Sequence, residues 1–394
     1  MDIVILAHFC LDFTEKDNSR FSYIANMLAN DNNVEVITSD FYHITKQKRC
    51  DIPKLPYKVT LLHEPSYPRN VCLKRFYSHY LWGVNVEKYL NQRKKPDVIY
   101  CAVPSITGPS KAAKYCKDNK IRFVIDVQDL WPEAFQMVLN IPLISKLLFY
   151  PFKASVNKIY ASADDICAVS DTYLNRALSV NRKCDKGQTV FLGTNLADFD
   201  SYAHQPPILN KKESEIWAAY CGTLGSSYDL TCVIDALQIL KNNDISVKLI
   251  VMGDGPKKEE FQKYAISKDV DAVFTGRLRY DQMCSLLCIC DITINPIMRG
   301  AAQSIINKHA DYAACGLPVV SSQENDEYRK LVEYYNMGFN CKNGSAADMA
   351  EKIAYLAQDE TLRNNMGKNS RRCAQEKFDR KVTYMAIVDA ILNK

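Results

Sequence analysis

The chain has 394 residues, of which 47% are hydrophobic and 24% are charged, and its formal net charge at pH 7 is +5. That length is too great for one ordinary hydrophobic core and predicts two domains, while the composition excludes disordered and fibrous proteins. A charge this small for the length does not indicate nucleic-acid binding, and we expect no nucleic-acid partner.

Cysteine usage and the length of the apolar runs bear on the cellular compartment. Fifteen cysteines lie scattered, several of them inside apolar runs such as 287–291. This pattern is typical of a reducing cytosol and not of a secreted disulfide scaffold. The apolar start of the chain is too short for a signal peptide, and no apolar run approaches the ~20 residues that span a bilayer. We therefore expect a cytoplasmic protein.

The first strand and helix of the chain are expected near its start. The apolar run 2–7 has the composition of a buried parallel strand. A polar loop, 8–19, leads into a helix that opens with Arg20. At that position the guanidinium is expected to reach a phosphate or a carboxylate of a ligand. The alternative is an ordinary solvated residue of a first helical turn.

Two segments are rich in aromatic and apolar residues beside basic ones. Segment 65–82 interleaves Arg69, Lys74 and Arg75 with aromatic residues, and segment 141–160 has lysines as its only charges. Aromatic rings at headgroup depth beside cations suit an anionic membrane surface, and neither segment is long enough to span it. Nucleic acid could use the mixture in the first segment, and burial in the core is the other interpretation of both segments.

A polar turn follows the strand expected at 122–126. Residues 127–133 read Val-Gln-Asp-Leu-Trp-Pro-Glu and lie at the carboxyl end of that strand, where open α/β sheets bind ligands. Asp129 is therefore a candidate site residue. The structural alternative is that Asp129 caps a helix beginning at Pro132.

The chain divides at a polar stretch that contains the consecutive prolines Pro206 and Pro207. Beyond it the alternation of strands and helices restarts. We expect an N-terminal domain at 1–198, a linker at 199–213, a C-terminal domain at 214–372 and a final helical region at 373–394.

Glycines end the first strands of the second half. The strand expected at 216–222 leads into a loop of small residues, 223–230, and the strand that begins at Val247 ends in Gly-Asp-Gly-Pro. Backbone N–H groups of such loops cradle phosphate, and glycine lets a nucleotide approach the backbone closely. The candidate residues here are Gly222, Thr223, Gly225, Gly253 and Gly255.

An acidic pair in the second half has the spacing of a metal site. Asp269 and Asp271 flank one valine. They precede a strand, on the side of the sheet away from ligands, so we interpret them as a surface turn and expect no bound metal.

The stretch 304–322 is predicted to form a helix that stops at Gly316, followed by a buried strand. Lys308 and Asp311 lie three residues apart, so both project from one side of that helix. A cation there would neutralise a phosphate, and a carboxylate would accept hydrogen bonds from ribose hydroxyls. The alternative is an ordinary surface ion pair.

Residues 307–320, Asn-Lys-His-Ala-Asp-Tyr-Ala-Ala-Cys-Gly-Leu-Pro-Val-Val, resemble the sugar-nucleotide signature of glycosyltransferase family 4. In that family a glutamate is followed, after seven residues, by a second glutamate that holds the ribose, and then by small residues and Gly-x-Pro. Asp311 matches the second acid, and Gln303 stands in the place of the first. The turn 129–133, Asp-Leu-Trp-Pro-Glu, resembles that of bacterial members that build capsule, O-antigen and exopolysaccharide.

The resemblance implies the GT-B fold, in which two Rossmann-like, doubly wound parallel-sheet domains face a cleft and the last helix crosses back to the first domain. It implies retaining, metal-independent transfer of a hexosyl or N-acetylhexosaminyl group from a nucleotide-diphosphate donor, with UDP as the expected nucleotide and no cofactor. The expected acceptor is a lipid-linked glycan or a polysaccharide, reached by peripheral binding at the inner face of the plasma membrane. Catalysis would rest on aligning the two substrates and stabilising the departing diphosphate.

The resemblance also assigns roles to residues. Most relatives carry an arginine and a lysine in the loop that here begins at Thr223, and this chain has no cation from there to Leu240. Lys308 and Arg299 are therefore expected to meet the phosphate charge. The expected donor-binding residues are Gly222, Thr223, Gly225, Gly253, Gly255, Gly276, Arg277, Arg299, Asn307, Lys308 and Asp311. The expected acceptor-binding residues are His8, Arg20, Asp129 and Glu133, and the expected catalytic residues are Asp129, Lys308 and Gln303.

Two other functions remain open. A UDP-sugar 2-epimerase shares this fold, although it does not usually carry the Asp-Leu-Trp-Pro-Glu turn. A catalytically inactive nucleotide-sugar-binding or scaffold subunit is the other alternative, favoured by Gln303 and by the loop without cations.

Overall fold

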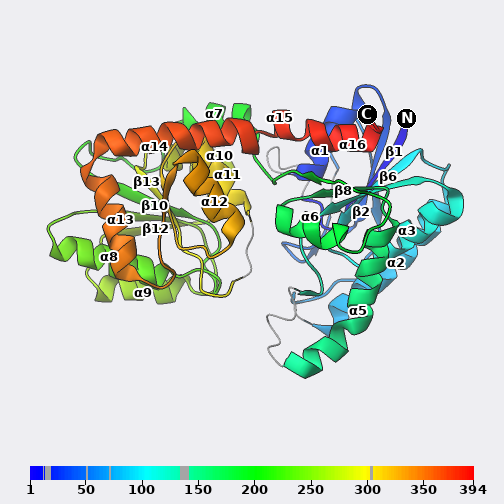
Figure 1. Ribbon diagram of the computed structural model, residues 1–394, viewed down its shortest axis with the longest axis horizontal. Helices are drawn as coiled ribbons and strands as arrows, with labels where there is room; N and C mark the ends of the chain where they lie inside the picture. The colour runs from blue at the N-terminus through cyan, green and yellow to red at the C-terminus, as the bar shows by residue number, and fades with distance from the viewer. Residues whose placement is uncertain (12, 14–18, 50–51, 71, 134–141, 302–304) are drawn as a thin grey trace. The chain divides into compact units, whose positions relative to one another are not determined.

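The computed structural model describes residues 1–394 except 12, 14–18, 50–51, 71, 134–141 and 302–304. The described residues form two compact units (Figure 1). Unit 1 comprises Met1–Val190 and Tyr384–Lys394, and unit 2 comprises Phe191–Thr383. Each unit contains a parallel β-sheet with helices packed beside it, so the expectation of two Rossmann-like α/β domains is confirmed.

The sheet of unit 1 has the strand order β5-β2-β1-β6-β7-β8-β9, and its strands pair in parallel. Its strands are nearly continuous apolar runs, and β6 is buried at every position, as expected for a sheet covered on both faces. The strands are β1 (Asp2–Leu6), β2 (Asn33–Ser39), β5 (Lys58–Leu62), β6 (Val98–Val103), β7 (Arg122–Val127), β8 (Asp165–Ala168) and β9 (Gln188–Thr189). A hairpin of β3 (Phe41–Tyr42) and β4 (Gln47–Lys48) follows β2. The helices are α1 (Arg20–Ala29), α2 (Leu73–Gln92), α3 (Thr107–Asn119), α5 (Pro142–Ser162), α6 (Asp171–Leu178) and α16 (Met385–Leu392).

The sheet of unit 2 has the order β12-β11-β10-β13-β14-β15, again with parallel pairing. Its strands are β10 (Trp217–Cys221), β11 (Lys248–Met252), β12 (Ala272–Gly276), β13 (Ile292–Asn295), β14 (Val319–Ser321) and β15 (Gly338–Asn340). Its helices are α7 (Leu196–Ala203), α8 (Leu230–Asn242), α9 (Lys258–Ser267), α10 (Tyr280–Cys288), α11 (Asn307–Ala314), α12 (Asp326–Tyr335), α13 (Ala346–Gln358), α14 (Glu360–Cys373) and α15 (Arg380–Thr383), with a π-helical segment at Ala374–Phe378. Because the strands are parallel, their carboxyl ends and the loops that follow them meet at one edge of each sheet.

The chain passes from unit 1 to unit 2 after Val190 and returns to unit 1 after Thr383. The sequence predicts these boundaries at 198 and 372. The stretch expected as a linker, 199–213, begins inside α7, whose Phe199 is buried in the core of unit 2. At the other end, α16 lies in unit 1. The side chain of Arg122 there donates a hydrogen bond of 2.8 Å to the carbonyl oxygen of Ile391.

The helix expected to stop at Gly316 is α11, which begins at Asn307. It ends at Ala314, and Gly316 follows with a φ angle of 66°, in the left-handed region that glycine adopts readily. Pro318 then leads directly into the buried strand β14. The stop signals in the sequence therefore act as expected and set where the helix ends.

Arg20 is held inside unit 1 by a buried carboxylate. Its side chain is only 4% exposed, and its Nε and Nη2 atoms donate to the two oxygens of Asp126 at 2.8 and 2.9 Å. Its Nη1 donates to the carbonyl oxygen of Val190, and its guanidinium lies 4.8 Å from the ring centroid of Tyr384. The structure therefore corrects the assignment of Arg20 to the acceptor site. The guanidinium N–H groups of Arg20 that a ligand would need are already bonded to the carboxylate of Asp126, in β7.

We expect Arg20→Ala to destabilise the full chain by about 3–5 kcal/mol, because it leaves the Asp126 carboxylate buried without its partner. Urea unfolding measures this loss. Lys114→Ala, which removes an exposed ion pair with Asp118 in the same unit, is the control and should leave the unfolding midpoint unchanged. Equal midpoints for both variants would show that the buried pair adds nothing to stability.

Candidate functional site

The loops that follow β10 and β11 pack backbone against backbone. A Cβ atom added at Gly253 would lie 1.8 Å from the carbonyl oxygen of Gly222, and one added at Gly255 would lie 2.4 Å from that of Leu224. The Leu224 N–H also donates to the carbonyl oxygen of Asp254 at 2.9 Å. These glycines are therefore required by the contact between the two loops, which holds both loops in place at the carboxyl edge of the sheet.

Lys308, the second residue of α11, is 7% exposed and reaches the loop after β10. Its Nζ atom lies 4.2 Å from the ring centroid of Tyr220 and 3.9 Å from that of Tyr228, which are cation–π contacts. A Cβ atom added at Gly222 would lie 3.4 Å from the same nitrogen. Within the described part of the chain, Nζ has no hydrogen-bond partner, and burial lowers the pKa of Lys308 to about 7. The amine of Lys308 thus lies buried beside the loop and has no anionic partner among the described residues.

Asp311, one turn further along α11, is buried to the same extent. It accepts a hydrogen bond of 2.7 Å from the hydroxyl of Tyr280, whose oxygen also lies 2.7 Å from Oγ1 of Thr194. Burial raises the pKa of Asp311 to about 6, against the opposing effect of the Tyr280 hydrogen bond. Since Lys308 and Asp311 are both buried, and no ion pair joins them among the described residues, the alternative of a surface ion pair is wrong.

The other expected donor residues of unit 2 differ in exposure. At Gly276 an added Cβ atom would lie 3.3 Å from Nζ of Lys258, a cation of α9 that the sequence did not indicate because nothing in its local pattern sets it apart from other surface lysines. At Gly225 an added Cβ atom would meet only a methyl group at 3.9 Å. Gln303 lies outside the described residues. The exposed side chains are those of Thr223, Arg277, Arg299 and Asn307.

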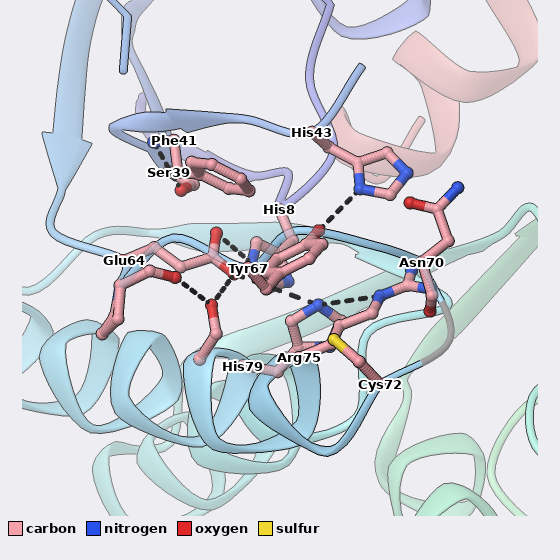
Figure 2. A network of polar contacts seen from close by, with 12 residues as sticks. His8, Ser39, Phe41, His43, Glu64, Tyr67, Asn70, Cys72, Arg75 and His79 are labelled. Atoms are coloured by element: carbon pink, nitrogen blue, oxygen red, sulfur yellow. Dashed lines mark hydrogen bonds and ion pairs between the residues drawn. The ribbon is translucent and has the colours of Figure 1, made fainter. Parts of the chain in front are cut away.

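In unit 1, His8 follows β1 at the carboxyl edge of the sheet and is 3% exposed (Figure 2). Its Nε2 atom lies 2.9 Å from Oε2 of Glu64, and its ring stacks on that of Trp82 with centroids 3.8 Å apart. The other oxygen of Glu64 accepts from the hydroxyl of Ser78 at 2.7 Å. Burial by itself would raise the pKa of Glu64, but the charge and hydrogen bond of His8 outweigh it and lower that pKa to about 2. His8 is enclosed by these neighbours, and its contact with an acceptor stays a prediction.

His8, Glu64 and His79 have the residue types of a metal site. Their ligand atoms all lie within 4.8 Å of one another. However, Nε of Arg75 donates to Nε2 of His79 at 3.4 Å, so a guanidinium faces the lone pair that a metal would use. Burial lowers the pKa of His79 to about 2, which keeps this imidazole neutral and an acceptor. The arrangement therefore suits an arginine-bound histidine better than a metal ion.

Asp129 and Glu133 follow β7 and are both engaged by protein groups. The oxygens of Asp129 accept from the Leu130 N–H at 2.9 Å and from Nε1 of Trp131 at 3.0 Å, while burial raises the pKa of this carboxyl. Glu133 forms an ion pair with Nε of Arg176 at 2.8 Å. Hydrogen bonds inside its own turn therefore orient Asp129, and its role toward an acceptor hydroxyl stays a prediction.

The aromatic and basic segment 65–82 has two different faces. From α2, Arg75, His79 and Trp82 point into unit 1, and an aromatic patch remains outside. The ring of Phe76 in this patch contacts Phe152 of α5 at 5.7 Å between centroids. Among the described residues, no helix is long and apolar enough to cross a membrane. The exposed members of the aromatic patch, with their exposed fractions, are Leu73 (86%), Phe76 (43%), Tyr77 (61%) and Tyr80 (55%) on α2 and Tyr150 (69%) on α5.

Comparison with known proteins gives matches to glycosyltransferases. Residues 202–373 match the family described as glycosyl transferases group 1. The chain is 20% identical over 341 residues to "Putative glycosyltransferase EpsD" of Bacillus subtilis (strain 168), covering 82% of each protein. It is 22% identical over 216 residues to an uncharacterized glycosyltransferase of Methanocaldococcus jannaschii, covering 55% of this chain and 56% of that relative, and so spans about half of the latter's length. A GDP-mannose-dependent phosphatidylinositol dimannoside mannosyltransferase of Mycobacterium tuberculosis is 25% identical over 168 residues, 42% of this chain and 40% of that one.

Solved structures resemble the whole chain. The structure of HepE from Anabaena in complex with UDP has a TM-score of 0.71 and 16% identity, with all of both chains covered. WaaG, described as a glycosyltransferase involved in lipopolysaccharide biosynthesis, has a TM-score of 0.68 and 16% identity, also over both whole chains. At such identities the likeness shows the fold alone. It confirms the expected GT-B fold class.

Lys308→Met should stabilise the full chain at pH 6, because it removes a buried charge and keeps an unbranched side chain between the rings. The pKa of Lys308 lies near 7 in the folded protein and at the usual 10.5 when exposed. Between these two pH values the unfolded state binds more protons than the folded state, so the stability of the parent rises with pH. The cost of burying the charged amine is therefore fully present below pH 7. We expect a gain of about 1–3 kcal/mol at pH 6, shrinking toward pH 9.

Urea unfolding at pH 6 and pH 9 measures both differences. Lys263→Met, at an exposed position of α9, is the matched control and should give the same difference from the parent at both pH values. A variant at Lys308 that is less stable than the parent at pH 6 would show that the ring contacts outweigh the cost of burial.

Proposed function

We propose that this protein is a retaining, metal-independent glycosyltransferase. It would move a hexosyl or N-acetylhexosaminyl group from a nucleotide-diphosphate donor, with UDP as the preferred nucleotide, to a lipid-linked or polysaccharide acceptor in cell-surface glycan synthesis. One observation carries the proposal: the Nζ atom of Lys308 is buried against the glycine loop after β10 and has no hydrogen-bond partner among the described residues. It lies in the unit that contains the match to glycosyl transferases group 1, and HepE of the same fold was solved with UDP.

The electrostatics around Lys308 favour an anionic ligand. A cation in the first turn of a helix is disfavoured, because the helix N-terminus carries partial positive charge, and α11 begins only one residue before Lys308. Burial adds a further cost, and the Tyr220 and Tyr228 rings offset it only in part. A diphosphate at this loop would interact favourably with the ammonium and with the helix terminus together. The arginine and lysine that relatives carry in the loop itself would thereby be replaced by one lysine from α11.

The ribose and the chemical step would depend on groups that the fold already positions. Asp311 would accept from ribose hydroxyls, with Tyr280 fixing its carboxylate. Lys308 would stabilise charge on the departing diphosphate, and Asp129 would handle the acceptor hydroxyl. The remaining rate enhancement would come from holding donor and acceptor in line. No cofactor enters this proposal.

The two alternative functions make different predictions. A "putative UDP-N-acetylglucosamine 2-epimerase" of Listeria monocytogenes shares the fold at a TM-score of 0.62 and 10% identity, so the fold by itself does not separate transferase from epimerase. Interconversion of UDP-sugars without any acceptor would favour the epimerase. Failure to bind either UDP or GDP would favour a scaffold subunit.

Lys308→Met should weaken UDP binding about ten- to a hundredfold, since a charge-assisted contact to phosphate is worth ~1.5–3 kcal/mol. Asp311→Asn keeps the size of the side chain and loses the charged acceptor, so its effect should appear in nucleotide affinity. Isothermal titration with UDP and GDP measures both. Lys263→Met should bind as the parent does. Parent-like affinity of Lys308→Met for both nucleotides would place the phosphate site elsewhere.

We also propose that the protein binds anionic membranes peripherally through the aromatic patch. Four of its members, Leu73, Phe76, Tyr77 and Tyr80, lie three and four residues apart on α2, which places them on one face of that helix. Lys74 and Lys153 are exposed on the same two helices. Rings and leucine would enter the headgroup region while the lysines meet lipid phosphates. A lipid-linked acceptor would be reached from that surface.

The double variant Leu73→Ser/Tyr77→Ser should lose most of its flotation with anionic liposomes at low salt, where electrostatic attraction is strongest. The matched control is Ile266→Ser/Tyr334→Ser, which removes one aliphatic and one aromatic side chain that are each 79% exposed on unit 2. The control should float as the parent does. If the parent itself stays at the bottom of the gradient, the proposal of membrane binding is wrong.

A further inference from the structure

In unit 1, Arg75 is a buried cation that forms no ion pair with a described residue. Arg75, from the first turns of α2, is 9% exposed. Its Nη1 donates to the carbonyl oxygen of Asn70 at 2.8 Å, and its Nε donates to His79 (Figure 2). Within the described part of the chain, no carboxylate lies within 4.0 Å of this guanidinium. Its partners are neutral groups, although a buried arginine ordinarily pairs with an acid.

Lys46 approaches the same place from the β3–β4 hairpin. Its Nζ lies 2.5 Å from the carbonyl oxygen of His43 and 2.5 Å from Oδ1 of Asn70. It also lies 4.8 Å from the ring centroid of Tyr67, against which the guanidinium of Arg75 lies at 5.8 Å. Burial and the charge of Arg75 lower the pKa of Lys46. Two cations that repel each other are therefore held around one tyrosine ring.

The acidic and imidazole groups nearby make no ion pair with these cations among the described residues. Glu64, the buried acid of this cluster, is already bonded to His8 and Ser78. His43 bonds to the Tyr67 hydroxyl at 2.6 Å, and burial together with the charges of Lys46 and Arg75 lowers its pKa to about 4. Among the described residues, neither Glu64 nor Asp129 forms an ion pair with Lys46 or Arg75, although both carboxylates act on the charge of Arg75 through space. An anion can reach the two cations, because Asn70 is exposed and Lys46 is only half-buried.

Aromatic faces complete the surroundings of the two cations. The guanidinium of Arg75 lies 4.9 Å from the ring centroid of Trp131 and 5.7 Å from that of Phe9. Phe9 follows β1 and Trp131 follows β7, so both rings come from loops at the carboxyl edge of this sheet. Rings of this kind supply flat apolar faces for the C–H groups of a sugar. Phe9 is half-buried and has area left for a ligand, whereas Trp131 is only 9% exposed and stacks on His79.

We propose that Lys46 and Arg75 form an oxyanion subsite for the acceptor, binding the phosphate or carboxylate of an anionic sugar whose ring lies against the aromatic side chains. The inference rests on the proposed function and specifies the acceptor as negatively charged close to a sugar ring. A glycosyl phosphate, as in a lipid-linked diphosphate glycan, and a uronic acid share this chemistry. Bidentate or paired donors to an oxyanion are the usual means of recognising either group.

Isothermal titration in saturating UDP, which fills the donor site, tests the subsite with three probes. Glucose 1-phosphate presents a phosphate, glucuronate presents a carboxylate, and methyl glucoside presents neither. We expect one or both anionic sugars to bind and the neutral sugar not to bind. Binding of glucose 1-phosphate alone assigns the phosphate source, and binding of glucuronate alone assigns the carboxylate. Absence of binding by both anionic probes overturns the proposal.

Lys46→Asn is the sharpest variant, because Lys46 has a φ angle of 61° and asparagine accepts that left-handed conformation, so the fold should persist. Its affinity for the anionic sugar should fall about tenfold, the loss expected for one charge-assisted contact. Lys48→Asn, two residues along the same hairpin and exposed, removes the same charge and should leave the affinity unchanged. An equal loss of affinity in both variants would mean that the anionic sugar is attracted by the overall positive charge and not by a specific contact, which would overturn the subsite.

The same titrations separate this inference from the proposed function. UDP binding by Lys46→Asn should equal that of the parent, because Lys46 belongs to unit 1 and the donor residues belong to unit 2. UDP binding without binding of an anionic sugar overturns the subsite and leaves the donor assignment standing. If UDP does not bind to the parent, the proposed function fails whatever the anionic sugars do.

Discussion

Burying a charged side chain is costly unless an opposite charge is buried with it. Unit 1 meets this constraint at Arg20, whose guanidinium forms two hydrogen bonds to the carboxylate of Asp126. Among the described residues no ion pair meets this constraint at Arg75 in unit 1 or at Lys308 in unit 2, where the neighbours are rings, carbonyl groups or glycines. The paired arginine is part of the scaffold. Arg75 and Lys308 lie at the carboxyl edges of the sheets, where a fold of this kind binds ligands.

Parallel strands explain why the groups of each candidate site meet although they are far apart in the sequence. In unit 1, His8 follows β1, Glu64 follows β5 and Asp129 follows β7, and all three lie at one edge of the sheet. In unit 2, the loops after β10 and β11 are so close that Gly253 leaves no space for a side chain. The two loops pack directly on each other, and the buried amine of Lys308 reaches them from α11.

The buried ionisable groups of α11 show how stability and ligand binding oppose each other. Lys308 has a pKa near 7 and Asp311 a pKa near 6, both moved toward the neutral form by burial. Each group destabilises the folded protein in the absence of ligand, and each has the charge that a sugar nucleotide would use. Natural proteins commonly retain such costs where function requires them.

The sequence by itself determined the alternation of strands and helices, the division into two α/β domains, and the placement of Lys308 and Asp311 on one helix with its stop at Gly316. These features are local, since hydrophobic periodicity and glycine or proline stop signals act over a few residues. Only the tertiary structure decided which charges are paired. Arg20 meets Asp126, which is 106 residues away, and Lys46 of the β3–β4 hairpin bonds to Asn70 and lies near the same Tyr67 ring as Arg75. Burial and counter-ions are set by such long-range contacts, and therefore the same residue type is part of the scaffold at Arg20 and a candidate for binding ligand at Arg75.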